Sequence, residues 1–203
     1  DAVRKQAELD ASSQLAVGIV VHDRRTKLDI DVQAHLVGDF DRPNLHYRVR
    51  PRTDSTTDVL GVIRRHPNAA GIVYCVRRRD TEELARELAR KGVRALPYHA
   101  GLDARERTRV QEAFRSESID VVVATVAFGM GIDRPDVRFV VHASLPKGME
   151  QYYQETGRAG RDGLAAECVL FFGGSDFHTW KGLLERGARE AELEGRPVDP
   201  RES

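Results

Sequence analysis

Short apolar runs alternate with segments of helical periodicity along most of this sequence. Gly71–Val76 (GIVYCV) and Ile119–Thr125 (IDVVVAT) are too short for helices and are typical of buried strands. Between such runs, apolar side chains recur at helical spacing, as at Leu84, Ala85 and Leu88. Buried strands that alternate with helices are typical of right-handed βαβ units. We therefore expect an α/β fold, with a mostly parallel sheet that helices cover on both faces.

Local signals place the ends of these elements. Asp80 and Asp103 are expected N-caps, each with a glutamate three residues later as in a capping box. We expect strands at 44–50, 71–76, 93–98, 119–125, 137–142 and 168–172, and helices at 56–65, 81–91, 104–114, 149–157 and 175–186. The chain divides into an N-terminal segment (1–38), whose apolar patch at Leu15–Val21 is a candidate strand, a main domain (39–186), and a charged tail (187–203) that we expect to fray.

The charge is balanced overall but unevenly distributed. Lys and Arg total 32, as do Asp and Glu, so the formal net charge is zero. This balance excludes a uniformly basic nucleic-acid coat and an acidic disordered tail. Residues 42–115, however, hold 17 basic side chains against 9 acidic ones. We expect this excess to give the domain one basic face for an anionic partner.

The sequence contains no signal for a membrane or for a disulfide framework. No apolar run approaches the roughly 18–20 residues of a membrane span, and the charged N-terminus does not resemble a signal peptide. Cys75 and Cys168 stand alone in the sequence, which is typical of reduced core residues in a cytosolic protein. We expect a cytoplasmic protein with no membrane partner and no metal ligands of its own.

The sequence also lacks the usual device for binding a nucleoside triphosphate. A P-loop requires a Gly-Lys dipeptide, and none occurs in the 203 residues. No Asp-Glu pair follows an apolar strand to hold magnesium either. The sheet therefore cannot cradle a triphosphate by this device alone.

Two glycine-rich segments have the chemistry to meet phosphate or backbone. Thr125 ends an apolar strand, and in the loop that follows Gly129 and Gly131 allow close backbone approach, while Asp133 supplies a carboxylate. The second segment, residues 154–163, reads QETGRAGRDG. Its two arginines are three residues apart, and each guanidinium offers planar paired donors that suit phosphate oxygens.

These segments carry a resemblance to a known family. Five motifs occur in the expected order: FDRPN (40–44), GIVYC (71–75), YHAGL (98–102), VATVAFGMGIDRPDVRFVVH (122–142) and YYQETGRAGRDG (152–163). From about Asp39 to about Trp180, the sequence resembles the second RecA-like lobe of a RecQ-type DNA helicase. The resemblance implies a RecA-like fold and a motor that hydrolyses ATP, with Mg²⁺, while it unwinds DNA in the 3′-to-5′ direction during repair or recombination.

The resemblance also implies roles for individual residues. Arg161 matches the arginine finger that reaches the γ-phosphate of ATP, and Arg158 matches the arginine that accompanies it. Gln154, Asp133, Gly129 and Gly131 match the nucleotide site, with Asp133 near the ribose. Thr125, Arg78 and His99 match positions that meet single-stranded or forked DNA. ATP and Mg²⁺ would be held mainly by a first RecA-like lobe of the same protein, so we expect this chain alone to be inactive.

The match has departures. In RecQ-type helicases a small hydroxyl residue usually stands where this sequence has Arg77, one residue beyond the position that follows YC. Arg134 stands where the family usually has a lysine. Residues 1–27 give no match. Two other functions stay open, namely a lobe of another superfamily 2 motor such as an RNA helicase, and a free-standing lobe that binds DNA or a partner without catalysis. The Gln-Glu start of the last motif favours the DNA helicase, since common RNA helicases place His-Arg there.

Each candidate residue also has an ordinary structural explanation. Arg158 and Arg161 could pair with Glu155 and Asp162, and Asp133 could brace its own turn. Thr125 could be a plain strand-end hydroxyl, and His99 a histidine bonded to its turn. Two further aromatic positions, Tyr152 and Tyr153, could stack on bases, but helix packing is the favoured interpretation.

Overall fold

The computed structural model describes residues 15–22 and 29–36 as backbone strands, and residues 42–125, 128, 134–176 and 178–182 in full. The first two segments, β1 (Leu15–His22) and β2 (Asp29–Leu36), form an antiparallel two-stranded sheet. The apolar patch predicted as a strand is therefore β1. The sequence analysis did not predict β2, although its residues, DIDVQAHL, alternate between polar and apolar as in a strand with one apolar face.

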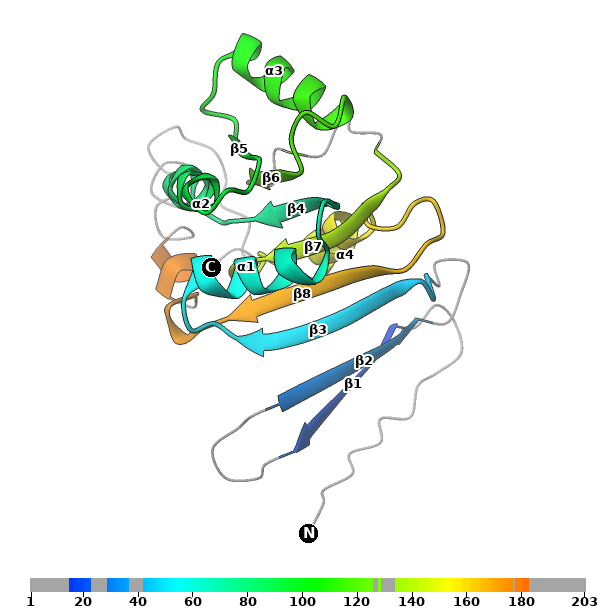
Figure 1. The fold of residues 1–203 in the computed structure, drawn as a ribbon. Helices are drawn as coiled ribbons and strands as arrows, with labels where there is room; N and C mark the ends of the chain where they lie inside the picture. The colour runs from blue at the N-terminus through cyan, green and yellow to red at the C-terminus, as the bar shows by residue number, and fades with distance from the viewer. Residues whose placement is uncertain are drawn as a thin grey trace, which may run out of the picture.

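The main domain is a parallel sheet of six strands in the order β3-β8-β7-β4-β6-β5 (Figure 1). Its strands are β3 (Leu45–Pro51), β4 (Ala70–Tyr74), β5 (Ala95–Tyr98), β6 (Val121–Ala124), β7 (Val137–His142) and β8 (Ala166–Phe172). All five strand pairs run parallel, each strand beside partners reached by a crossover. The predicted α/β fold is confirmed.

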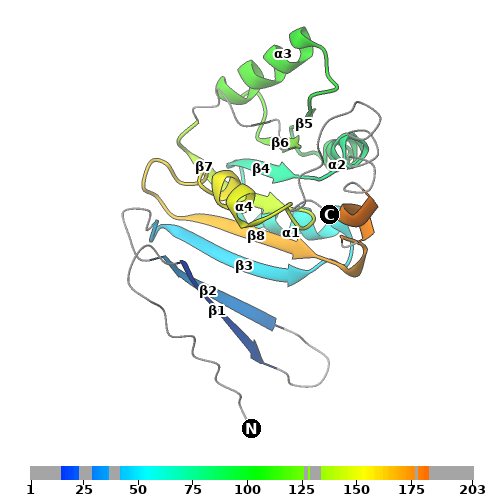
Figure 2. The same ribbon diagram turned by 180° about the vertical axis from the view of Figure 1, so that it is seen from behind.

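Helices cover both faces of this sheet. They are α1 (Ser55–Arg65), α2 (Arg78–Arg90), α3 (Ala104–Arg115) and α4 (Met149–Thr156). Figure 1 shows α1 in front of the sheet, and Figure 2, seen from behind, shows α4 in front of the opposite face. Because side chains alternate across a strand, β4 sends Ile72 to the α3 and α4 face and Val73 to the α1 and α2 face. Two hydrophobic cores result, one on each side.

The two predicted N-caps have different outcomes. The carboxylate of Asp103 accepts a hydrogen bond from the backbone N–H of Glu106 at 2.8 Å, so this cap is confirmed. The prediction for Asp80 is wrong, because α2 begins earlier and its N-cap is Arg77. Asp80 lies instead in the first turn, where it accepts a hydrogen bond from Arg77 Nε at 2.7 Å. A negative charge in the first turn still stabilises the positive end of the helix.

The two cysteines are free and buried, one in each core, as predicted. Burial raises the pKa of Cys75 and of Cys168 to about 12. The thiols therefore stay protonated and unreactive at neutral pH. Within the described part of the chain, no helix is both long and apolar enough to cross a bilayer. The predicted tail at 187–203 lies outside the described residues.

Candidate functional site

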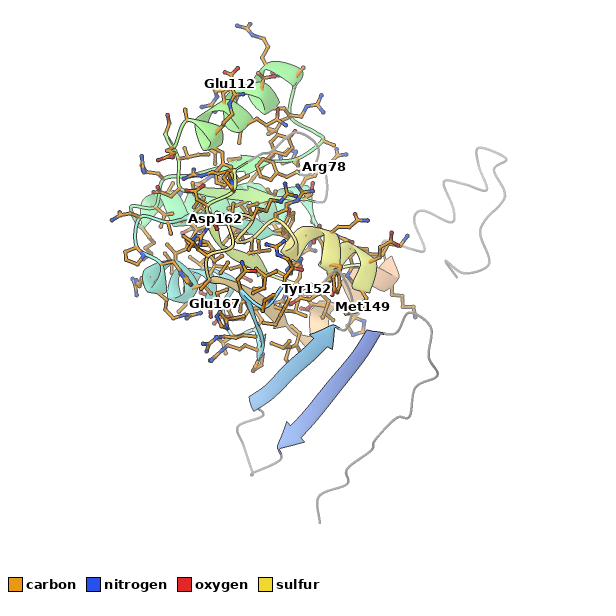
Figure 3. All side chains as sticks on the ribbon, turned by 90° about the vertical axis from the view of Figure 1, so that its right-hand side faces the viewer. Arg78, Glu112, Met149, Tyr152, Asp162 and Glu167 are labelled. Carbon is orange, nitrogen blue, oxygen red and sulfur yellow. The ribbon has the colours of Figure 1, made fainter. Side chains whose placement is uncertain are left out.

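The first candidate site is the turn that follows α4, residues 157–163, which we call the arginine turn. Since α4 returns from the carboxyl end of β7 to the amino end of β8, this turn lies at the amino ends of the strands. Gly160 N–H donates to the carbonyl of Val137, the first residue of β7, at 2.9 Å. Figure 3 labels Met149 at the start of α4 and Asp162 in the turn beyond its other end. The arginine turn therefore lies at the edge of the sheet opposite the carboxyl ends of the strands, where ligands of open α/β sheets usually bind.

The arginine turn exposes one guanidinium and half-buries the other. Arg161 is exposed, and its Nε donates to the carbonyl of Gly157 at 3.3 Å. Burial raises the pKa of the Tyr74 phenol. The positive charge of Arg158 lies close enough to Tyr74 to act in the opposite direction, with a smaller effect. The buried Nε of Arg158 has no acceptor among the described atoms. The guanidinium of Arg161 is therefore the one of the two that lies in reach of an anion in solvent.

The salt bridges that offered a structural explanation for these arginines do not form. The carboxylate of Asp162 pairs with Arg138 at 2.5 Å. The carboxylate of Glu155 accepts from His142 at 2.6 Å and from Gln151 at 2.9 Å. Among the described residues, neither Arg158 nor Arg161 forms an ion pair with a carboxylate.

Of the four residues predicted to contact the nucleotide, Gln154, Asp133, Gly129 and Gly131, the structure describes Gln154. Gln154 is exposed in the last turn of α4, where its side chain reaches Glu150 at 3.4 Å. Asp133, Gly129 and Gly131 lie outside the described residues, so their roles stay predictions. Among described side chains, no three His, Cys, Asp or Glu residues gather as a metal would require. The guanidinium pair suits phosphate oxygens rather than a cation.

Two described residues show how this loop is anchored. Phe128 is buried against the rings of Tyr98 and Phe114, with centroids 4.7 and 6.0 Å away. Its carbonyl accepts a hydrogen bond from the hydroxyl of Tyr74 at 3.2 Å. Arg134 is buried at the far end of the loop, donating to the carbonyl of Phe114 at 2.7 Å. The guanidinium of Arg134 thus ties the segment just before β7 to α3.

The three predicted DNA contacts lie together at the carboxyl edge of the sheet. Arg78 begins α2 after β4, His99 follows β5, and Thr125 follows β6, and these three strands are neighbours. A Cβ built on Gly101 would lie 3.1 Å from His99 Nδ1 and 3.2 Å from Arg78 Nη1, so both side chains border this glycine. The fold therefore assembles the set that the sequence separates by 47 residues.

His99 is the member of this set with the strongest structural role. Its ring is buried, with Nδ1 accepting from the backbone N–H of Gly101 at 3.2 Å. Nε2 then carries the hydrogen and donates to Glu82 at 3.0 Å. Both ring nitrogens are engaged within the fold, which supports the explanation of His99 as a turn histidine. Contact with DNA stays a prediction for all three residues.

A groove of about 720 Å³ lies at the same edge of the sheet, beyond β4 and β7. It lies between the N-terminal parts of α1 and α2 and the helical residues 174–176 and 178–182, and it does not include the arginine turn. Its polar lining includes Arg52, Thr56, Arg77, Ser144, Ser175 and Thr179. Trp180 docks the last helical segment by donating to the carbonyl of Leu145 at 2.7 Å.

The aromatic residues of α4 pack within the domain. The ring of Tyr152 lies 6.2 Å from that of Tyr47 and 4.8 Å from that of His142. Burial raises the pKa of Tyr152, as expected for a phenol removed from water. The favoured prediction of helix packing is supported at this position.

Sequence reasoning missed four residues that hold the site together: Arg42, Asn44, Tyr74 and His142. Arg42 and Asn44 belong to the FDRPN motif, and their hydrogen-bond partners lie more than 110 residues away in the sequence. A polar Arg-Pro-Asn turn placed before a strand was the one available signal.

Comparison with known proteins decides the family. Residues 54–163 match the family described as the helicase conserved C-terminal domain, which is more than half of the chain. The chain belongs to this family. This helicase C-terminal domain is 43% identical over 180 residues to the ATP-dependent DNA helicase hus2/rqh1 of Schizosaccharomyces pombe. It is 47% identical over 152 residues to the ATP-dependent DNA helicase RecQ of Pasteurella multocida. The resemblance to RecQ-type helicases is therefore confirmed.

These matches cover most of this chain but a small part of the relatives. The alignments span 88% and 74% of the chain, against 14% and 24% of the two helicases. Among solved structures, a DEAD box protein from Methanococcus jannaschii is 25% identical, with a TM-score of 0.58 over 71% of the chain and 40% of that protein. The DEAD-box protein SrmB of E. coli, with a TM-score of 0.54 over 63% of the chain and 75% of that protein, is 24% identical and supports the RecA-like fold alone.

Proposed function

We propose that this helicase C-terminal domain is the second motor lobe of an ATP-dependent DNA helicase, and that Arg161 acts in ATP hydrolysis. The carrying observation is that Arg161 is exposed on a braced turn with no carboxylate partner among the described residues. A guanidinium held in this way is ready to meet an anion from outside the domain. The relatives named as ATP-dependent DNA helicases support ATP and DNA as the ligands.

The proposed chemistry is the attack of water on the γ-phosphorus of ATP, giving ADP and phosphate. Negative charge spreads over the transferring phosphoryl oxygens in the transition state, where planar paired donors are most valuable. Arg161 would stabilise this charge, and Arg158, half-buried beside Tyr74, would support it. Since the sequence lacks a P-loop, the first RecA-like lobe of the same protein would hold ATP and Mg²⁺. Gln154 and Asp133 would contact the nucleotide at the cleft between the two lobes.

The DNA strand is proposed to cross the carboxyl edge at Arg78, His99 and Thr125. The exposed Arg78 supplies a charge for a backbone phosphate, and the hydroxyl of Thr125 a hydrogen bond. Opening and closing of the two lobes would then move single-stranded or forked DNA in the 3′-to-5′ direction. Action in repair or recombination and a location in the bacterial cytosol or nucleoid are further parts of the proposal.

The test uses the full-length protein that contains this chain, with Arg161→Ala, Arg161→Lys and Arg158→Ala. We expect Arg161→Ala to lower DNA-stimulated turnover by about 10³–10⁵ while nucleotide affinity stays nearly unchanged. Lysine should rescue little, because an ammonium cannot reproduce the planar fork. Near-normal turnover in Arg161→Ala would refute the arginine finger.

Unwinding assays separate the remaining alternatives. We expect the full-length protein to open a DNA duplex with a 3′ overhang and to leave an RNA duplex of the same sequence closed. Opening of the RNA duplex alone would favour an RNA motor. Failure on both substrates, without ATP turnover, would favour a non-catalytic binding lobe.

A further inference from the structure

We propose that Arg42 and Asn44 are positioning residues for ATP hydrolysis, because they bind the backbone of the arginine turn from behind. This inference rests on the proposed function of Arg161. Both residues lie just before β3, an edge strand of the sheet. They are more than 110 residues away in the sequence from the turn that they contact. In the described part of the chain, the side chains of Arg42 and Asn44 form their hydrogen bonds with backbone carbonyls of the turn and of Leu164, and not with the side chains of Arg158 or Arg161.

The guanidinium of Arg42 contacts three backbone carbonyls of the turn. Its Nη2 donates to the carbonyl of Ala159 at 2.7 Å and to that of Gly160 at 2.8 Å. Its Nη1 reaches the carbonyl of Gly157 at 3.5 Å. Hydrogen bonds from a charged donor are stronger than neutral ones, and the half-buried side chain limits competition from water. One side chain thus fixes the carbonyls on both sides of Arg158.

Asn44 adds a second clamp on the far side of the turn. Its Nδ2 donates to the carbonyls of Gly160 and Leu164, at 2.8 and 2.9 Å. The backbone carbonyl of Asn44 accepts a hydrogen bond from the N–H of Ala166 at 2.9 Å, at the point where β8 begins. The amide therefore spans the turn from Gly160 to Leu164, and Arg161 lies between these two points.

The RPN part of the FDRPN motif explains how both clamps face the same way. Leu45 N–H donates to the carbonyl of Arg42 at 2.9 Å, which closes a four-residue turn. Pro43 occupies the second position of this turn, where its fixed φ is favourable. Arg42 is the first residue of this turn and Asn44 is the third. Strand β3, which begins at Leu45, holds the turn in place.

Gly160 is the point at which both clamps meet. Its φ is +54°, in the left-handed region that glycine adopts at little cost. A Cβ there would lie 2.5 Å from Asn44 Nδ2 and 2.7 Å from the carbonyl oxygen of Leu164. A side chain at this position would displace the clamp, so the glycine, Asn44 and the shape of the turn depend on one another.

The consequence for catalysis concerns the precision of Arg161. A displacement of about 1 Å in a catalytic group can cost about 10²-fold in rate. Among the described residues, the Arg161 side chain forms its hydrogen bond with the carbonyl of Gly157, which Arg42 also approaches. Without Arg42, water can solvate the freed carbonyls, so the turn persists but samples more positions. The loss should therefore fall on turnover and not on folding or nucleotide binding.

The experiment compares Arg42→Ala, Arg42→Lys and Asn44→Ala in the full-length protein, with Arg64→Ala as the matched control. Arg64 is exposed on α1, on the other face of the sheet. We expect Arg42→Ala to lower DNA-stimulated kcat about 10–100-fold, with nucleotide Kd changed less than about threefold. Lysine should restore only part, since one ammonium cannot replace the fork, and Arg64→Ala should match the parent.

The double variant Arg42→Ala with Arg161→Ala separates positioning from general damage. If Arg42 acts through Arg161, the double variant should turn over no more slowly than Arg161→Ala alone. An additional loss in the double variant, or normal kcat in Arg42→Ala while Arg161→Ala is impaired, overturns the inference and leaves the proposed function standing. Normal kcat in Arg161→Ala overturns the proposed function itself. If Arg42→Ala does not fold, Arg42→Lys and Asn44→Ala are judged by the same criteria.

Discussion

His142 Nε2 and Glu155 Oε2 lie 2.6 Å apart in a buried hydrogen bond that joins the end of β7 to α4. The ring of His142 also stacks on Tyr74, with centroids 5.3 Å apart. Tyr74 in turn binds the carbonyl of Phe128. A continuous chain of contacts therefore connects the loop that follows β6 with the helix that carries the arginine turn.

We expect Glu155→Ala to destabilise the domain by about 1–3 kcal/mol. The substitution leaves the buried Nε2 of His142 and the amide of Gln151 without their acceptor, and each loses a hydrogen bond that water cannot easily replace. Urea denaturation of the chain measures the change. Gln154→Ala is the control, because this neighbour is exposed and its loss should cost under about 0.5 kcal/mol. Equal midpoints for the two variants would contradict the assignment.

Gly71→Ala tests the close approach between β4 and β7. A Cβ at Gly71 would lie 1.9 Å from Cε2 of Phe139, whose ring is fully buried. We expect overpacking to cost about 1–3 kcal/mol. Thermal unfolding should show that adding Phe139→Leu to Gly71→Ala recovers part of this loss, although Phe139→Leu alone is destabilising. Strictly additive effects would mean that the two side chains do not compete for space.

Glu167→Gln should make stability less dependent on acid pH. Burial tends to raise the pKa of Glu167, but hydrogen bonds from Arg65 and His66, with the charge of Arg48, lower it below its usual range. A lowered folded pKa adds stability above the unfolded value of about 4.3, and that stability is lost as pH falls through the folded pKa. The parent should therefore exceed the variant by about 1.5–3 kcal/mol at neutral pH.

Urea titrations between about pH 7 and pH 3 should show the two proteins converging as the carboxylate is protonated. Glu106→Gln is the control, since the ion pair of Glu106 with Arg109 lies on the surface and its loss should change stability little. A constant difference between parent and Glu167→Gln across this range would refute the electrostatic explanation.

The chain should bind single-stranded DNA weakly and with strong salt dependence. The excess of basic residues at 42–115 motivates this, since each neutralised phosphate releases a counterion. Arg78→Ala should reduce the slope of log K against log salt by about 0.7–1, whereas Arg64→Ala, the same charge change on α1, should leave it nearly unchanged. Fluorescence anisotropy at several salt concentrations provides the slopes. Equal slopes for both variants would argue against a DNA path at the carboxyl edge.

Sequence periodicity predicted most of the fold because it depends on local physics. β7 has the predicted bounds, Val137–His142, and the other strands of the parallel sheet and the four helices agree within a few residues. The position of the N-cap was predicted wrongly at Asp80, because an acidic residue stabilises a helix both as its N-cap and inside its first turn. The same local chemistry is compatible with either position.

The sequence by itself also determined which side chains are suited to phosphate, since GRAGR presents two guanidinium groups among glycines. Only the tertiary structure decided that these arginines form no ion pair with a described carboxylate, because Arg138 and His142 bind the nearby Asp162 and Glu155. It alone brought Arg42 to the carbonyls of Ala159 and Gly160 across more than 115 residues of chain. Hydrogen bonds between segments so far apart depend on strand order, and no local pattern encodes which strand lies beside which.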